Sequence, residues 1–284
     1  MNNKLLTIGM STYDDFDGVY FTIQSLRIYH DLKDIEIIVL DNNSESEHGK
    51  QTKGFIDGWA GSIAKYIPIK DKPSSFNKYK IVDYANSRYI LILDCHILLV
   101  QNAIQNLLDY YTKHPDCKDL IQGPLLYDDL SSYATEFKDE WRGDMYGTWF
   151  ANREAYNKGE PFEIKMQGMG LCSFEKKNWP GICPYFKGFG AEEGYLAEKF
   201  RRNGGKNICL PSLKWVHRFG RPNGVKYPLI LEDRIWNYFV GWLEITRDPN
   251  HHMIVDTYNH FKGRIPPESL DNILQRAKNK ILNT

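Results

Sequence analysis

Residues 89–96 read Tyr-Ile-Leu-Ile-Leu-Asp-Cys-His, an apolar run that ends abruptly in polar side chains. Such a run predicts a strand buried on both faces, as in the parallel sheets of α/β proteins. Side chains two residues apart on a strand point the same way, so Asp94 and His96 are expected to lie together where the strand leaves the core. Open α/β sheets bind their ligands at this edge. The pair is suited to a divalent cation, although a strand end that only caps the core is an equal alternative for so short a pattern.

Strand and helix patterns alternate through the first half of the chain. Apolar runs that predict further strands occur at 5–10, 35–40 and 63–69. Helical patterns occur at 18–29, 76–86 and 103–111. This alternation predicts right-handed βαβ units, and therefore an α/β fold with a mostly parallel mixed sheet flanked by helices.

The second half of the chain has a less regular pattern. Residues 123–163 mix acidic, aromatic and turn residues without a period, which predicts long functional loops over a rigid sheet. Strands are expected at 165–174 and 208–216, and helices at 191–203, 229–245 and 267–281. We therefore predict two units, an α/β domain over residues 1–222 and a helical C-terminal extension over 223–284 that packs on it.

Charge and cysteine content limit the classes of partner and compartment. The 36 basic and 36 acidic residues balance, so no strong long-range field attracts nucleic acid or anionic lipid, although a local basic patch is still allowed. The five cysteines are odd in number and lack metal-like spacing, which favours reduced thiols in the cytoplasm. The N-terminus lacks a signal-peptide core, and no stretch approaches the roughly 18 apolar residues of a membrane span. We expect a soluble cytoplasmic protein without a transmembrane segment; the oligomeric state is open.

Polar loops follow three of the predicted strands, at 12–15, 41–44 and 94–96. In a parallel sheet these loops meet at one edge. Asp41 could accept a hydrogen bond from a nucleobase or a ribose hydroxyl, and the short side chain of Thr12 would let a base approach the backbone. Helix capping and turn formation are the more frequent roles of such residues.

Two further polar groups lie in the second half of the chain. Glu192 and Glu193 begin a predicted helix, where they either complement the helix dipole or accept a proton or hydrogen bond from an incoming hydroxyl. His217 lies between aromatic and basic residues. Together with Asp94 and His96 it would complete a mixed oxygen and nitrogen ligand set, better suited to Mn²⁺ than to Mg²⁺ or Ca²⁺.

In this order, the motifs resemble those of nucleotide-sugar glycosyltransferases of the Rossmann-like GT-A fold. The N-terminal half is similar to the inverting family of bacterial processive and non-processive transferases. The metal motif and second half are more similar to the polypeptide N-acetylgalactosaminyltransferases, which combine Asp-x-His, a Gly-Gly-Glu-Asn segment and a later metal-binding histidine. Asp94-Cys95-His96 matches the first, Gly190-Ala191-Glu192-Glu193 approximates the second, and His217 fits the third. The resemblance covers residues 5–222.

The resemblance implies a metal-dependent transfer of a hexosyl or N-acetylhexosaminyl group from a UDP-sugar to an acceptor hydroxyl. Asp94, His96 and His217 would hold Mn²⁺ against the diphosphate. Glu192 would orient the donor sugar or the acceptor hydroxyl, and Glu193 would be the base if the reaction inverts. The donor-binding residues implied in this way are Thr12, Asp14, Asp41, Asp94, Gly168, Gly170, Arg218 and Arg221.

Two departures from the family pattern concern the start of the helix at 191–203. Ala191 replaces a glycine, which is expected to narrow the sugar pocket. Glu193 stands where the family has asparagine, so that retaining and inverting outcomes are both open.

The acceptor and two rival classes of function are also open. A glycan, a protein or a modified nucleic-acid base would each offer a hydroxyl. A sugar-nucleotide or nucleotidyl transferase is disfavoured because the loop at 11–15 is acidic rather than rich in glycine and lysine. A non-catalytic carbohydrate- or nucleic-acid-binding protein would not need three separated metal-ligand candidates.

Overall fold

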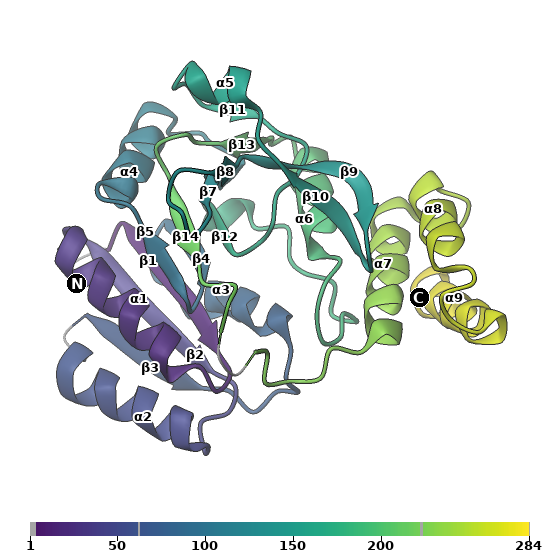
Figure 1. Cartoon of the computed structure of the whole chain (residues 1–284), viewed down its shortest axis with the longest axis horizontal. Coiled ribbons are helices and arrows are strands. Elements are labelled where there is room, and N and C mark those ends of the chain that lie inside the picture. The colour runs from purple at the N-terminus through teal and green to yellow at the C-terminus, as the bar shows by residue number, and fades with distance from the viewer. Residues whose placement is uncertain (1–3, 62, 222–223, 284) are drawn as a thin grey trace.

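Residues 89–94 of the apolar run form a strand near the centre of a mixed sheet (Figure 1). The structure is a computed structural model that describes residues 4–61, 63–221 and 224–283. The eight strands of this sheet follow the order β11-β13-β6-β12-β4-β1-β2-β3. Their bounds are β1 (Leu6–Thr12), β2 (Ile35–Asp41), β3 (Ala64–Pro68), β4 (Tyr89–Asp94), β6 (Leu120–Gln122), β11 (Phe162–Glu163), β12 (Leu171–Glu175) and β13 (Asn207–Cys209).

The parallel half of the sheet brings three strand ends together. Strands β3, β2, β1 and β4 are parallel neighbours, and Thr12 is in register with Asp41, while Ser11 is in register with Asp94. Strand β12 runs antiparallel to β4, so its beginning also lies at this edge. The backbone N–H of Asp94 donates to the carbonyl of Gly170 over 2.9 Å. The expected convergence of polar loops at one edge is therefore confirmed.

Alternate residues of the central strands enter two separate hydrophobic clusters. Leu91 and Leu93 of β4 pack in the cluster that contains residues of α1 (Phe16–Tyr29) and α4 (Ala103–Lys113). Ile90 and Ile92 pack in the cluster that contains residues of α6 (Glu192–Arg202) and of the C-terminal helices. Burying one such side chain stabilises the fold by about 1.5–3 kcal/mol. Burial on both faces explains why the sequence of β4 lacks polar alternation.

A smaller sheet carries the second histidine of the predicted metal site. It has the order β5-β14-β7-β8, with β5 (Ile97–Leu99), β7 (Leu125–Leu126), β8 (Tyr133–Ala134) and β14 (Trp215–His217). Strand β5 follows β4 after a two-residue turn and pairs antiparallel with β14, with Ile97 opposite His217. This register places His217 beside His96, although the two histidines are far apart in the sequence.

Three predicted segments differ from the structure. Residues 123–163 were expected to be loops, but they contain the hairpin of β9 (Glu136–Arg142) and β10 (Met145–Phe150), and helix α5 (Arg153–Asn157). The register of this hairpin shifts at Gly147, which breaks the alternation that identifies a strand. The helix expected at 76–86 is a 3₁₀ helix, η2 (Ser75–Lys80), followed by the short α3 (Ile81–Tyr84). The strand expected at 165–174 begins only at Leu171.

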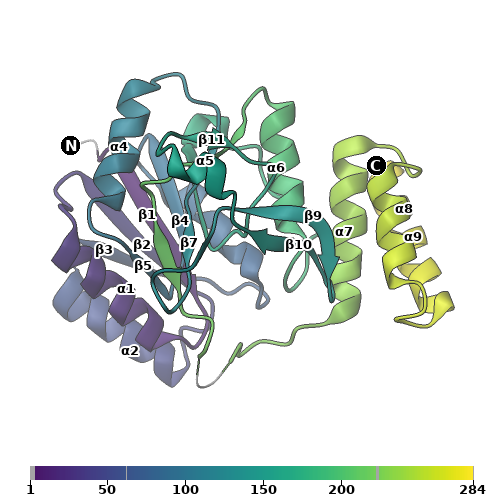
Figure 2. The same ribbon diagram turned by 45° about the horizontal axis from the view of Figure 1, so that its top comes forward.

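Three long helices end the chain: α7 (Leu231–Thr246), α8 (His252–Phe261) and α9 (Pro267–Leu282). Helix α7 lies next to α6, and α8 and α9 lie on its outer side (Figure 2). Helices α8 and α2 (Glu47–Phe55) were not predicted. Apolar residues of α7, α8 and α9 share the hydrophobic cluster of β4 and α6. The predicted boundary between 222 and 223 lies outside the described residues, so the division into two units stays a prediction.

The sequence predicted no membrane-spanning segment and reduced cysteines. Within the described part of the chain no helix is long and apolar enough to cross a membrane. All five cysteines are buried free thiols.

Candidate active site

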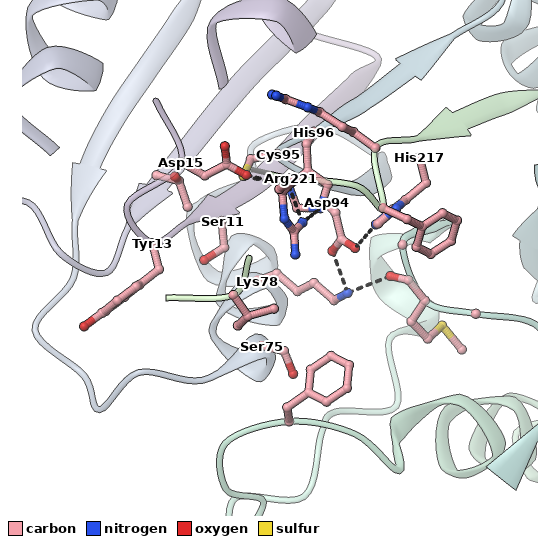
Figure 3. A pocket seen from close by; sticks show the side chains of 18 of the residues that line it. Ser11, Tyr13, Asp15, Ser75, Lys78, Asp94, Cys95, His96, His217 and Arg221 are labelled. Carbon is pink, nitrogen blue, oxygen red and sulfur yellow. Dashed lines mark hydrogen bonds and ion pairs between the residues drawn. The ribbon is translucent and has the colours of Figure 1, made fainter. Parts of the chain in front are cut away.

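A cavity of about 530 Å³ opens at the carboxyl edge of the parallel strands (Figure 3). Its walls come from the loop after β1, the ends of β4 and β14, the segment before β12, and the start of α6. Nearly all of the predicted site residues line it, namely Thr12, Asp14, Asp94, His96, Gly168, Gly170, Glu192, Glu193, His217, Arg218 and Arg221.

Three of these residues form a cluster that could hold a metal ion. Asp94, His96 and His217 each offer one ligand atom, and these atoms lie within 4.8 Å of one another. Asp94 Oδ2 is 3.4 Å from His217 Nε2, and the two imidazole rings meet edge to face with centroids 4.8 Å apart. One oxygen and two nitrogen ligands are a donor set that suits a divalent transition-metal ion. The remaining positions would stay available to water or substrate oxygens.

The Asp94 carboxylate also pairs with a buried lysine that sequence reasoning missed. Lys78 of η2 donates from Nζ to Asp94 Oδ1 over 3.0 Å, as Figure 3 shows, and to the carbonyl of Met169 over 2.6 Å. The Lys78 side chain is only 7% exposed. Burial by itself raises the pKa of Asp94, but the charge of Lys78 and the hydrogen bond with His217 lower it well below the usual range. Asp94 is therefore ionised at neutral pH.

His96 is supported from behind by another residue that was not predicted. Asp15 Oδ2 lies 2.8 Å from His96 Nδ1, and Asp15 Oδ1 accepts the backbone N–H of Gly18 at the start of α1. Burial lowers the pKa of His96 below 6.5 despite this partner, so the imidazole is neutral at pH 7. The predicted neighbour, Asp14, instead accepts hydrogen bonds from the Asn43 side chain at 3.0 and 3.1 Å.

A second group of possible ligands, Asp15, Cys95 and His96, shares the His96 side chain. Burial raises the pKa of the Cys95 thiol well above its usual range. A protonated thiol is a poor metal ligand, because the thiolate is the form that binds metals. The cluster of Asp94, His96 and His217 is therefore the better metal candidate.

Gly168 and Gly170 are glycines because other groups approach them closely. A Cβ at Gly170 would lie 3.1 Å from the Trp215 ring and 3.3 Å from Asp94 Oδ2. A Cβ at Gly168 would lie 2.7 Å from the Trp149 ring. Both glycines keep this wall of the cavity open beside the Asp94 carboxylate.

Two adjacent carboxyl groups also line the cavity. Glu192 and Glu193, at the first turn of α6, are 3% and 7% exposed, and Glu192 Oε2 has no hydrogen-bond partner within the described ranges. Burial raises the pKa of both carboxyl groups, and the charge of Glu192 raises that of Glu193 further. Ala191 precedes them with a φ of 81° and is not among the residues that line the cavity, so a narrowing of the sugar pocket by its methyl group stays a prediction.

Asp41 is the one predicted donor-binding residue that lies behind the cavity wall. Its Oδ1 accepts the backbone N–H of Asn43 and its Oδ2 accepts the Tyr66 hydroxyl, each over 2.8 Å. Asn42 lines the cavity in its place. In the structure Asp41 has the turn-forming role of an aspartate, and a contact with the donor stays a prediction.

Comparison with solved structures shows the same architecture in glycosyltransferases. GalNAc-T7, crystallised with UDP, GalNAc and Mn²⁺, matches 99% of this chain with a TM-score of 0.73 and 15% identity; the chain covers 57% of that protein's length. The structure of residues 1–349 of TarS from S. aureus matches 98% with a TM-score of 0.62 and 12% identity, over 81% of that chain. The mannosyltransferase PcManGT from Pyrobaculum calidifontis, in complex with GDP-Man and Mn²⁺, matches 99% with a TM-score of 0.53 and 12% identity, over 71% of that chain.

Sequence comparison identifies the family. The profile of glycosyl transferase family 2 matches residues 7–173, more than half of the chain, from β1 to β12. In a comparison with curated proteins the sequence has no match. The matched segment contains Asp94 and His96 but ends before Glu192 and His217. The chain belongs to glycosyl transferase family 2 and is a glycosyltransferase with the GT-A fold.

Proposed function

We propose that this glycosyltransferase depends on a divalent cation, Mn²⁺ by preference, and transfers a sugar from a UDP-sugar to a hydroxyl group of its acceptor. The observation that carries the proposal is the cluster of Asp94, His96 and His217 in the wall of the cavity. The donor set and its charge state support metal binding, because Asp94 is ionised and His96 is neutral.

Different residues of the chain would bind the diphosphate, the nucleoside and the sugar of the donor. Arg218 and Arg221 lie on the His217 side of the cavity, where guanidinium groups would form charge-assisted hydrogen bonds with a diphosphate. Thr12 and Asp14 line the end nearest β2, where the nucleoside would bind. Gly168 and Gly170 leave room for the sugar ring beside Asp94. When bound, the cation would neutralise charge that develops on the departing UDP.

The two glutamates are the candidates for catalysis at the acceptor. Both line the cavity from the start of α6, and both are buried. A buried carboxyl with a raised pKa is a suitable general base near neutral pH. Glu193 is the base if the reaction inverts, and Glu192 would orient the donor sugar or the acceptor hydroxyl.

The test is release of UDP from UDP-glucose, UDP-galactose, UDP-GlcNAc and UDP-GalNAc, with Mn²⁺ and with EDTA. We expect slow hydrolysis of one donor, lost with EDTA and in His217→Ala. His252→Ala, which changes an exposed histidine on α8, is the matched control and should behave as wild type. GDP-mannose serves as the donor control.

The outcomes separate the parts of the proposal. Hydrolysis of GDP-mannose alone would overturn the choice of UDP but keep the metal site. Hydrolysis that continues with EDTA and in His217→Ala would overturn the metal site. If no UDP-sugar is hydrolysed and UDP does not bind in a Mn²⁺-dependent manner, the proposal as a whole is wrong.

A further inference from the structure

The two imidazoles of the candidate metal site have different surroundings. His96 Nδ1 has a carboxylate partner, Asp15 Oδ2, at 2.8 Å. His217 Nδ1 is buried and has no hydrogen-bond partner in the part of the chain that the structure describes. The support given by Asp15 is therefore a local feature of His96 and not a property that both histidines share.

The hydrogen bonds of His96 define which ring nitrogen carries the proton. An ionised carboxylate only accepts hydrogen bonds, so the bond to Asp15 requires a proton on Nδ1. In a neutral imidazole Nε2 then holds a lone pair. Arg221 Nη1 also lies against this ring, 3.0 Å from Nδ1 and closer to Nε2, so its position does not by itself select one tautomer.

Asp15 is itself held in place by the fold. It is the N-cap residue of α1, and its second oxygen, Oδ1, accepts the Gly18 N–H over 3.1 Å. A Cβ at Gly18 would lie 2.9 Å from both oxygens of this carboxylate, so a larger residue at 18 would displace it. One oxygen is thus fixed by the helix, and the other is directed at His96.

We propose that Asp15 is a positioning residue for the metal site, because it fixes the tautomer and orientation of His96 so that Nε2 presents its lone pair to the cation. This inference rests on the proposed metal-dependent function. Carboxylate partners of this kind orient metal-bound histidines, and their loss typically lowers metal affinity about 10–100-fold.

Two substitutions at Asp15 separate this role from helix capping. In Asp15→Asn, Oδ1 can still accept from Gly18, while the NH₂ group replaces Oδ2 and donates to Nδ1. The ring proton then moves to Nε2, and the lone pair no longer faces the cation. In Asp15→Ser the cap also remains, but the side chain is too short to reach His96, so either tautomer is allowed. Asparagine and serine are equally good N-caps.

The first measurement is Mn²⁺ affinity in the presence of UDP, from the electron paramagnetic resonance signal of free Mn²⁺. We expect Asp15→Asn to bind Mn²⁺ about 10–100-fold more weakly than wild type, and Asp15→Ser to lose less. Thermal unfolding of both variants checks that the fold is kept. Equal affinities in Asp15→Asn and Asp15→Ser, or wild-type affinity in Asp15→Asn, would overturn the inference.

The second measurement needs no metal. ¹⁵N NMR of the histidine side chains, with His96 assigned by comparison with His96→Gln, reports which nitrogen carries the proton. We expect Nδ1–H in wild type and Nε2–H in Asp15→Asn. An Nε2–H tautomer in wild type would overturn the inference directly. If the tautomers are as expected but wild type binds no Mn²⁺, the proposed function is wrong, and the role of Asp15 toward a metal is overturned with it.

Discussion

Lys78 and Asp94 form an ion pair in which the buried lysine contacts one carboxylate oxygen and leaves the other for the candidate metal site. Lys78 Nζ is 3.0 Å from Asp94 Oδ1, whereas Oδ2 faces His217 Nε2 at 3.4 Å. A bound cation and Lys78 would therefore share the charge of the Asp94 carboxylate, with the cation at Oδ2 and Lys78 at Oδ1.

Lys78→Met tests this division. Removing one partner of a fully buried pair typically costs about 3–5 kcal/mol of folding free energy, and we expect less here because the Asp94 side chain is 28% exposed. We expect this loss without metal, and a partial recovery when Mn²⁺ and UDP are added, because the cation then compensates Asp94. Thermal unfolding with and without Mn²⁺ measures both effects.

Lys80→Met is the control for Lys78→Met. Lys80 is on the same helix, but its pair with Asp71 is about 40% exposed on both sides, and such pairs contribute at most about 1 kcal/mol. Mn²⁺ should stabilise Lys80→Met no more than wild type. An equal effect of Mn²⁺ on Lys78→Met and wild type would show that Lys78 and the cation do not share Asp94.

Gly170→Ala is expected to weaken the metal site without unfolding the protein. The new Cβ would lie 3.3 Å from Asp94 Oδ2 and 3.1 Å from the Trp215 ring, so these groups must shift by a few tenths of an ångström. Mn²⁺ affinity should fall several-fold, with a stability loss of about 1–3 kcal/mol from overpacking. The control is Gly54→Ala on α2, where nothing lies within 4 Å and stability should rise by about 0.5–1 kcal/mol. Unchanged Mn²⁺ affinity in Gly170→Ala would contradict the close contact.

Ala191→Gly should stabilise the protein, because Ala191 has a φ of 81°, in the left-handed region where a Cβ costs about 1–2 kcal/mol. Part of this gain is offset by the greater freedom of glycine in the unfolded chain, which leaves roughly 0.5–1 kcal/mol. Ala197→Gly, in the middle of α6, is the same substitution at a helical φ and should destabilise by more than about 1 kcal/mol, because helix propensity and a buried methyl group are both lost. Urea unfolding measures the change in folding free energy of each variant. A loss of stability in Ala191→Gly would contradict the backbone strain inferred at Ala191.

Much of the sheet could be predicted from the sequence because β1, β2 and β4 are buried on both faces and therefore read as apolar runs. The same pattern placed the polar ends of these strands at one edge. Strands of the β9–β10 hairpin escaped prediction because the register shift at Gly147 interrupts their alternation. The helix expected at 76–86 is a 3₁₀ helix up to Lys80 and a four-residue α-helix after it, and two turns of 3₁₀ helix are too few for their period of 3.0 residues to be recognised in the sequence.

The supporting residues of the site were not predictable, because their roles depend on three-dimensional neighbours. Asp14 and Asp15 are adjacent residues of the same type, but Asp14, which has a positive φ, accepts from Asn43, whereas Asp15 contacts His96. Lys78 and Lys80 look alike in the sequence, yet only Lys78 lies beneath Asp94. The oxygens of Asp41 are occupied partly by Tyr66, on the neighbouring strand β3.

Glu193→Gln should raise stability in a pH-dependent manner. Burial, followed by the charge of Glu192, raises the pKa of Glu193 in the folded protein above its ordinary 4.5, while Lys78 and Arg234 offset part of this effect. The folded state then binds more protons than the unfolded state, so wild type loses stability as the pH rises above 4.5. Glutamine resembles the protonated form and avoids this loss. We expect little difference from wild type at pH 4.5 and a gain on the order of 1–3 kcal/mol at pH 8.

The pH dependence distinguishes this effect from a simple packing change, which would be the same at both pH values. Glu198→Gln on α6 is the control of opposite sign: burial raises the pKa of Glu198, but its bonds from Arg202 and Arg201 lower it further, below the ordinary value. Its stabilising contribution is present above pH 4.5 and is lost as the pH falls through the lowered pKa. Glu198→Gln should therefore lose stability at pH 8, by up to about 1 kcal/mol for a pair near the surface. A gain in Glu193→Gln that does not grow between pH 4.5 and pH 8 would show that Glu193 is already ionised in the folded protein, and would remove the argument that it is poised to accept a proton near neutral pH.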